Sequence, residues 1–344
     1  MTKNAESRFY TPSTRRLERP AAAGDSRGFR YVLSEAGSRS LEDRLERLSS
    51  PYLNPEETLG EIFPAFASTF PRDLWTRLLQ FRADPDAPGF GILGNLPVDR
   101  HLPPTPHDGK RAGEKVTFVS EACLLGVALI LGEPFGYRLE KDGDLVHNVC
   151  PVRGRESTRS NESSLSDFQF HTENAFFEYR PQFLLLACLR GHEGTGEAAT
   201  TVAEAKAACR LLDGSILEEL RKPQFLVRSP ESCGEVRWSE PTPALLGPGE
   251  RPELRINLNN MKALSARAEA ALGELGRALG DPSILRKFYL RPGEMLLVDN
   301  RKAVHGRTPF RPRFDGKDRW LQRVYVGGNL WRTRREGEGS YRVL

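Results

Sequence analysis

Residues 170–176 read FHTENAF and give the clearest indication of what this chain binds. Side chains i and i+2 of a strand point to the same side, so His171 and Glu173 can face one metal ion while Thr172 points away. Two imidazoles and one carboxylate form the ligand set that leaves one face of an octahedral Fe(II) open for a co-substrate and dioxygen. The stretch therefore predicts a metal site whose second histidine comes from another part of the chain.

His305 is the predicted third ligand. It follows the apolar run 295–298 and precedes Gly306, a pattern typical of a buried strand that turns into a loop at a site. Cys150 and His147 suggest a thiol nucleophile, but positions i and i+3 of a strand face opposite sides, so we reject that pair. A histidine without such a setting is more often a surface or packed residue, and we give no site role to His101, His107, His147 and His192.

Residues 319–326 read RWLQRVYV and alternate as in a half-buried strand. The odd positions then share one face, which carries Arg319, Arg323 and Tyr325. The two guanidiniums are expected to lie roughly 13 Å apart along the strand and to line a pocket.

Five stretches fall in an order that resembles one known group of enzymes. The chain resembles the clavaminate synthase-like group of Fe(II)/2-oxoglutarate-dependent oxygenases, of the TauD/TfdA-type superfamily, and within it the amino-acid hydroxylases. The resemblance implies a mainly β, α+β fold with flanking helices around a double-stranded β-helix, a distorted, cupin-like jelly roll with the metal at one mouth. The stretches are 131–137 (LGEPFGY), 170–176 (FHTENAF), 180–190 (RPQFLLLACLR), 199–202 (ATTV) and 305–310 (HGRTPF).

The resemblance also implies where 2-oxoglutarate binds. Arg319 is expected to anchor its far carboxylate, since a planar guanidinium offers two hydrogen bonds as well as charge. Thr200 is expected to add a hydroxyl, with Thr201 as the adjacent alternative. Both threonines also fit a strand or a helix N-cap, and the sequence leaves that open.

The substrate residues follow from the same resemblance. Arg323 matches the position that binds an α-carboxylate, although a surface-facing strand arginine is the alternative. Glu140 is the expected partner of the α-amino group, with Glu173 able to contribute its free oxygen. Ser164, next to Ser163, lies on the segment that is expected to close over the substrate.

The stretch 256–260 departs from members that act on arginine, which tend to have an Asp-x-Asp pair there. This chain has Asn257 and Asn259 instead. Neutral amides donate and accept hydrogen bonds but do not compensate a buried positive charge. We therefore expect a substrate with a neutral or polar side chain, or a derivatised amino acid, unless both asparagines serve as loop caps.

The expected function is hydroxylation of an unactivated C–H bond of a free or derivatised amino acid in specialised metabolism, with release of succinate and carbon dioxide. Fe(II), 2-oxoglutarate and dioxygen are the expected cofactor and co-substrates. Glu173 as a ligand disfavours halogenation, while desaturation, epoxidation and ring formation stay open, since they depend on where the substrate carbon lies. A metal-binding barrel without turnover is the alternative from another class. A zinc hydrolase is a second alternative, since the same three ligands bind Zn(II), but this chain has no evident general base or helix-borne H-E-x-x-H.

Composition indicates an ordinary enzyme of 344 residues, with 38% hydrophobic and 28% charged residues. Residues 1–38 are expected to form a loosely ordered arm, and residues 39–344 a single oxygenase domain with helical insertions, including a buried helix at 116–131. No signal peptide and no membrane span are expected, and the five cysteines are not expected to form a disulfide framework. These expectations favour a cytoplasmic location. The net charge of +4 gathers near the ends without a nucleic-acid-binding signature, so a small amino-acid-like molecule is the expected partner, with the oligomeric state left open.

Overall fold

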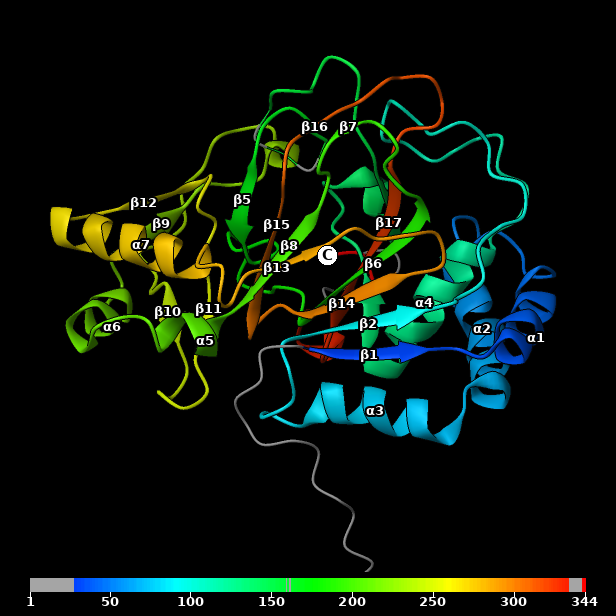
Figure 1. The fold of residues 1–344 in the computed structure, drawn as a ribbon, viewed down its shortest axis with the longest axis horizontal. Helices are drawn as coiled ribbons and strands as arrows, with labels where there is room; N and C mark the ends of the chain where they lie inside the picture. The colour runs from blue at the N-terminus through cyan, green and yellow to red at the C-terminus, as the bar shows by residue number, and fades with distance from the viewer. Residues whose placement is uncertain (1–27, 159, 161, 334–341) are drawn as a thin grey trace, which may run out of the picture.

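The computed structural model of the protein describes residues 28–158, 160, 162–333 and 342–344 (Figure 1). The domain was expected to begin at residue 39. Strand β1 (Phe29–Val32) lies before that residue, and helix α1 (Glu35–Leu45) begins before it. β1 pairs in parallel with β2 (Phe90–Gly94), a partner far away in the sequence. The predicted arm is therefore wrong for residues 29–38, because local composition does not reveal a remote strand partner; residues 1–27 lie outside the described residues.

A seven-stranded mixed sheet is the larger of two main sheets. Its strand order is β1-β2-β14-β6-β17-β3, and β4 also pairs with β17. Every residue of β17 is buried, so the prediction of a half-buried strand over 319–326 is wrong, because helices cover its second face. The remaining strands are β3 (Glu133–Phe135), β4 (Val146–Val149), β6 (Phe183–Arg190), β14 (Met295–Asp299) and β17 (Trp320–Gly327).

Helix α4 (Val119–Leu131) packs on β6 and β17, which confirms the buried helix predicted at 116–131. Side chains of β17 form hydrogen bonds on this side of the sheet. Gln322 Nε2 donates to Glu121 Oε1 of α4 at 2.8 Å, and Trp320 Nε1 donates to Asn148 Oδ1 of β4 at 2.8 Å. Helices α2 (Pro55–Thr69) and α3 (Arg72–Ala83) pack against α4 from outside.

The smaller main sheet is antiparallel, with the strand order β13-β8-β15-β5. His305 lies inside β15 (Ala303–Arg307), opposite His171 at the end of β5 (Phe168–His171). The expected loop at His305 is therefore wrong. A Cβ on Gly306 would lie 2.6 Å from the Phe168 carbonyl oxygen, so the glycine permits a close approach of β5 rather than a turn. The other strands are β8 (Thr200–Glu204) and β13 (Arg286–Phe288).

The two main sheets share a core. Leu296 and Tyr325 of the larger sheet belong to one cluster of buried side chains with Val202 and Ala303 of the smaller sheet. The architecture is thus α+β, with two packed sheets and flanking helices.

A third group of elements packs beside β8 and β15, at the left of Figure 1. Within the described part of the chain, no helix has the length and hydropathy that crossing a membrane requires. The elements of this group are α5 (Ala205–Cys209), α6 (Gly214–Leu220), β9 (Phe225–Val227), β10 (Leu245–Leu246), β11 (Glu253–Leu254), β12 (Met261–Ala263) and α7 (Ala266–Leu279). Short elements elsewhere are β7 (Thr195–Gly196), which pairs with β16 (Phe310–Arg311), and the 3-10 turns η1 (Lys141–Gly143), η2 (Glu231–Cys233) and η3 (Leu330–Thr333).

Candidate active site

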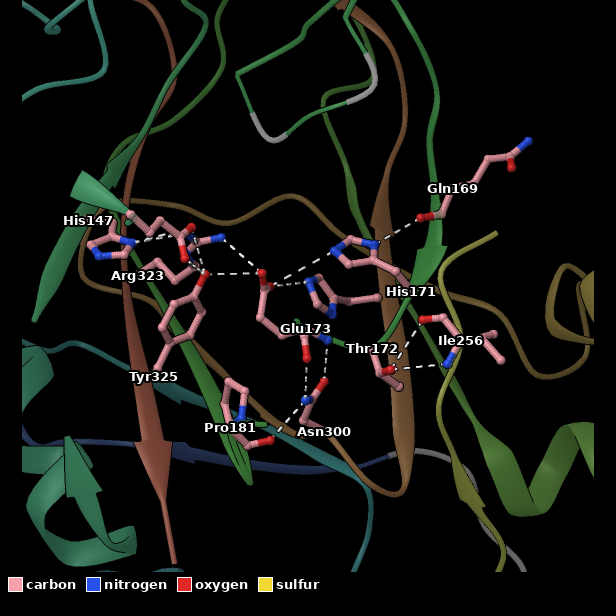
Figure 2. A network of polar contacts seen from close by, with 12 residues as sticks. His147, Gln169, His171, Thr172, Glu173, Pro181, Ile256, Asn300, Arg323 and Tyr325 are labelled. Atoms are coloured by element: carbon pink, nitrogen blue, oxygen red, sulfur yellow. Dashed lines mark hydrogen bonds and ion pairs between the residues drawn. The ribbon is translucent and has the colours of Figure 1, made fainter. Parts of the chain in front are cut away.

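His171, Glu173 and His305 come together as one buried cluster (Figure 2). One ligand atom from each residue lies within 4.8 Å of the others. Glu173 Oε2 lies 4.0 Å from His171 Nε2 and 3.3 Å from His305 Nε2. These separations suit three ligands on one side of a metal ion.

Backbone contacts orient the segment that carries two of these residues. β5 ends at His171, so Glu173 lies in the turn that follows rather than within the strand. Thr172 points away from the cluster, as predicted, and its hydroxyl lies 3.2 Å from the backbone of Ile256. The amide of Asn300 accepts from the Glu173 N–H at 2.7 Å and donates to the Glu173 carbonyl at 3.2 Å.

The protonation states of the cluster suit a metal. Burial lowers the pKa of His171 to about 3, and its Nδ1–H donates to the Gln169 carbonyl at 3.0 Å, which leaves the Nε2 lone pair toward the cluster. Burial alone raises the pKa of Glu173, but Arg323 and the two histidines hold that pKa well below its usual range. Neutral imidazole and ionised carboxylate are the metal-binding forms. The residues therefore fit a divalent metal with open positions.

A cavity that is open to solvent adjoins this cluster and is lined from both main sheets. Its polar lining includes Thr200, Arg307, Arg319 and Arg323 beside the three candidate ligands. The cavity thus places a metal site and three guanidiniums in one enclosure.

Arg319 lies at one end of this cavity, immediately before β17. Its Nη2 donates to Thr200 Oγ1 at 2.9 Å, and Arg319 forms no ion pair within the described part of the chain. Burial lowers the pKa of Arg319 to about 10, still high enough to keep the charge. Thr201 does not line the cavity, so of the two candidate threonines Thr200 is the one beside Arg319.

Arg323 lies near the three candidate metal ligands and is held by carboxylates. Its Nη2 donates to Glu140 Oε1 at 2.5 Å, and its Nη1 donates to Glu173 Oε1 at 3.2 Å. The structure thus brings together the predicted pair of Arg323 and Glu140. The Tyr325 hydroxyl, whose pKa burial raises well above its usual range, lies against the same two carboxylates.

His147 also contacts Arg323, through Nδ1 at 2.9 Å, while its Nε2 lies 2.8 Å from the Asp144 carbonyl. Burial lowers the pKa of His147 to about 4, so the ring is neutral and its Nδ1 accepts from the guanidinium. Sequence reasoning treated His147 as a packed residue and missed this contact. The position follows from pairing, because β4 places His147 opposite Arg323 on β17.

Four predicted substrate residues do not line the cavity: Glu140, which lies behind Arg323 as its ion-pair partner, and Ser164, Asn257 and Asn259. Ser164 is fully buried, and its hydroxyl has no partner within the described residues. Asn257 lies opposite His171, and its Oδ1 accepts from the Asn260 N–H at 3.2 Å, which is the loop-capping alternative. The amide nitrogen of Asn259 is buried and lacks a partner among the described residues.

Sequence reasoning also missed Arg307 and Asn300. Arg307 Nη1 donates to the Ser163 carbonyl, and Nη2 donates to Ser163 Oγ at 3.1 Å and to the Ser166 carbonyl at 2.9 Å. It therefore fastens the segment 163–166 to the strand that carries His305. Arg307 stands within the stretch HGRTPF, and Asn300 follows an apolar strand, so the sequence drew attention to both positions. It did not reveal which residues they contact.

Comparisons with known proteins agree with this geometry. A family model described as "Taurine catabolism dioxygenase TauD, TfdA family" matches residues 100–325. The "L-asparagine oxygenase" of Streptomyces coelicolor is 36% identical over 91% of this chain and 94% of its own length. "Clavaminate synthase 2" of Streptomyces clavuligerus is 33% identical over 80% of this chain and 83% of its own length. A crystal structure of asparagine oxygenase in complex with Fe(II), 2S,3S-3-hydroxyasparagine and succinate superposes with a TM-score of 0.82, at 36% identity, over 92% of this chain and 98% of that one.

Proposed function

Since the chain belongs to the TauD/TfdA family of dioxygenases, we propose that it is an Fe(II)- and 2-oxoglutarate-dependent oxygenase that hydroxylates an unactivated C–H bond of an amino acid. The observation that carries this proposal is the shared cavity, which is lined by His171, Glu173, His305, Arg319 and Arg323. One enclosure offers a metal site, an anchor for a dicarboxylic keto acid and a cation for a substrate carboxylate.

The metal and the keto acid bind to four of these residues and to Thr200, which also lines the cavity. His171, Glu173 and His305 hold Fe(II), which when bound supplies dioxygen activation coupled to the oxidation of 2-oxoglutarate to succinate and carbon dioxide. Arg319 orients the far carboxylate of the keto acid with two hydrogen bonds, and Thr200 adds a third donor. The absence of a carboxylate partner for Arg319 within the described residues supports this role, because a buried cation requires an anion.

The two charged residues that are proposed to bind the substrate already pair with each other. The buried Arg323 and the half-buried Glu140 form an ion pair at 2.5 Å. An amino acid carries one charge of each sign, so its carboxylate replaces Glu140 at Arg323 and its ammonium pairs with the released Glu140. Each charge keeps a partner through this exchange, whereas a molecule with one blocked group compensates only one of the two charges. The proposed substrate therefore has a free α-amino group and a free α-carboxylate.

The side chain of the substrate is neutral or polar. Neither Asn257 nor Asn259 lines the cavity, but Asn257 lies opposite the candidate ligand His171, and amides at these positions do not compensate the positive charge of a cationic side chain. Ser164 belongs to the covering segment that Arg307 holds at Ser163 and Ser166.

The proposal also covers the fold, the cellular location and the metabolic role of the protein. Two sheets with a common core and a cavity between them support a double-stranded β-helix in one domain that starts at β1. The five cysteines are unpaired, which supports a cytoplasmic location. The likeness to clavaminate synthase supports a role in specialised metabolism.

The test is succinate formation from 2-oxoglutarate by protein loaded with Fe(II) under anaerobic conditions and then exposed to air. A panel of free amino acids with neutral, acidic and cationic side chains is compared with the N-acetyl and C-amide derivatives of the best one. Turnover stimulated by one free amino acid, and lost in His171→Ala and Arg319→Ala, supports the proposal. A folded protein that binds metal but yields no succinate with any of them is a binding barrel instead.

The mass of the product separates hydroxylation from desaturation and ring formation. Hydroxylation adds one oxygen atom to the amino acid, whereas desaturation and ring formation remove two hydrogen atoms. We expect the mass of the added oxygen, and a loss of two hydrogens would replace hydroxylation by one of these alternatives.

A further inference from the structure

The hydroxyl of Tyr325 lies between two carboxylates (Figure 2). Its oxygen lies 3.0 and 3.1 Å from the two oxygens of Glu140, and 3.2 Å from Oε1 of Glu173. Tyr325 follows Arg323 by two residues on β17, so both side chains are on the same side of the sheet. The contact joins a proposed substrate residue to a proposed metal ligand.

This hydroxyl has fewer protons than neighbours. A phenol donates a single hydrogen bond, so Glu140 and Glu173 compete for one proton. Arg323 divides its donors between the same two residues, at 2.5 Å for Glu140 and 3.2 Å for Glu173. Both the Tyr325 hydroxyl and the Arg323 guanidinium therefore lie farther from Glu173 than from Glu140.

The Tyr325 ring has little freedom to move away from this position. It packs against Phe135, Tyr137 and His147, with ring centroids 6.0, 5.8 and 5.4 Å away. The Arg323 guanidinium lies over the same ring, 4.5 Å from its centroid. Redirection of the hydroxyl proton is thus the change that this packing permits.

We propose that Tyr325 is a positioning residue that couples Glu140 to the metal ligand Glu173. When a cationic group pairs with Glu140, that carboxylate competes less for the hydroxyl proton, and the hydrogen bond to Glu173 Oε1 strengthens. A donor on Oε1 keeps Oε2 as the atom that faces the two histidines. Occupancy of the substrate end is thereby communicated to the metal site. The inference rests on the proposed role of Glu173 as a ligand.

The first test measures Co(II) affinity of the metal-free protein, without turnover. Tyr325→Phe keeps the ring and removes the hydroxyl, and we expect its Co(II) affinity to fall about tenfold, as for other groups that orient metal ligands. The matched control is Tyr137→Phe, which removes a buried phenol that donates to the Tyr179 carbonyl at 2.7 Å. An unchanged affinity in Tyr325→Phe, or an equal loss in both variants, overturns the inference.

The second test is a double-mutant cycle with Glu140→Gln, again read as Co(II) affinity. Loss of the Glu140 charge acts through space in the same way with or without the hydroxyl, so that contribution cancels in the cycle. We expect Glu140→Gln to change the affinity of the unmodified protein and of the Tyr325→Phe variant differently, by at least about twofold, as for contacting residues. Additive effects overturn the coupling. A starting protein that binds no Co(II) sinks the proposed metal site as well, so the two failures are distinct.

Discussion

Arg319 lies immediately before β17 and Arg323 lies four positions further on within it, yet Arg323 is paired with two carboxylates while Arg319 donates to the hydroxyl of Thr200. Both are buried. The two ends of the cavity therefore differ in electrical balance. This difference fits the proposed roles, in which Arg319 binds an anion and Arg323 and Glu140 bind a molecule that carries one charge of each sign.

Replacement of Arg319 is expected to weaken the use of 2-oxoglutarate. Arg319→Met removes hydrogen bonds to a charged group, each worth about 1.5–3 kcal/mol, so KM for 2-oxoglutarate should rise at least about tenfold. Arg319→Lys should lie between, because it keeps the charge without the planar fork. Thr200→Val is the milder comparison, with a loss of about fivefold. Steady-state kinetics over 2-oxoglutarate concentration decide, and an unchanged KM in Arg319→Met would move the anchor elsewhere.

Asn257→Asp should change which amino acids are accepted. A carboxylate keeps the acceptor for the Asn260 N–H, so the loop is retained, and it adds the charge that a cationic side chain requires. We expect the ratio of kcat/KM for lysine or arginine to that for neutral amino acids to rise about tenfold, or about 1.4 kcal/mol. Asn257→Ser keeps an oxygen without the charge and should leave the ratio unaltered. An equal ratio in all three proteins removes Asn257 from substrate selection.

Asn300→Ala should destabilise the metal-free protein. The buried Asn300 amide bonds to the Glu173 N–H and to the carbonyls of Glu173 and Pro181. Its removal leaves buried backbone groups unpaired, so we expect the free energy of unfolding in urea to fall by about 3 kcal/mol. Asn54→Ala, at an exposed position, should change it by less than about 0.5 kcal/mol. A similar small change in Asn300→Ala would show that the clamp on Glu173 is dispensable.

His147 should make the protein less stable in acid. Its pKa is about 4 in the folded state against a usual 6.5, so between these values the unfolded chain binds more protons. The stability that neutral His147 provides is fully present above pH 6.5 and is lost as the pH falls toward 4, by about 3 kcal/mol in total.

The comparison for this prediction is His147→Gln, which has no charge to gain. Free energies of unfolding in urea, measured from pH 7 to 4 with chelator present, should fall less steeply for His147→Gln than for the unmodified protein. Parallel curves would mean that His147 accepts a proton without loss of structure. Because His171 is present in both proteins, its own titration does not enter the difference.

The residues that sequence reasoning identified share a local signal. His171 and Glu173 stand two positions apart, and Arg319 and Arg323 follow a strand period, so each pair could be read from neighbours in the chain. His147, Asn300 and Arg307 could not, since their partners lie on strands and loops far away in the sequence. Strand register sets these contacts, and a single sequence does not encode register in any one segment.

The loop expected at His305 failed for a related reason. Gly306 reads as a turn residue when neighbours alone are considered. Its role is steric, because the backbone of β5 passes where a side chain would be. The half-buried strand expected over 319–326 was wrong in the same sense, since charged and polar side chains on β17 face buried partners rather than water.

The hydrogen bonds on the reverse side of β17 help to keep the arginines of the site facing the cavity. Trp320 and Gln322 are held by Asn148 and Glu121, and they alternate with Arg319 and Arg323 along the strand. A slip of one residue would turn both arginines toward α4 and present an indole and an amide to the cavity. The proposed keto-acid anchor and the proposed substrate cation therefore depend on the alignment of one short segment, which is held by hydrogen bonds that contact neither molecule.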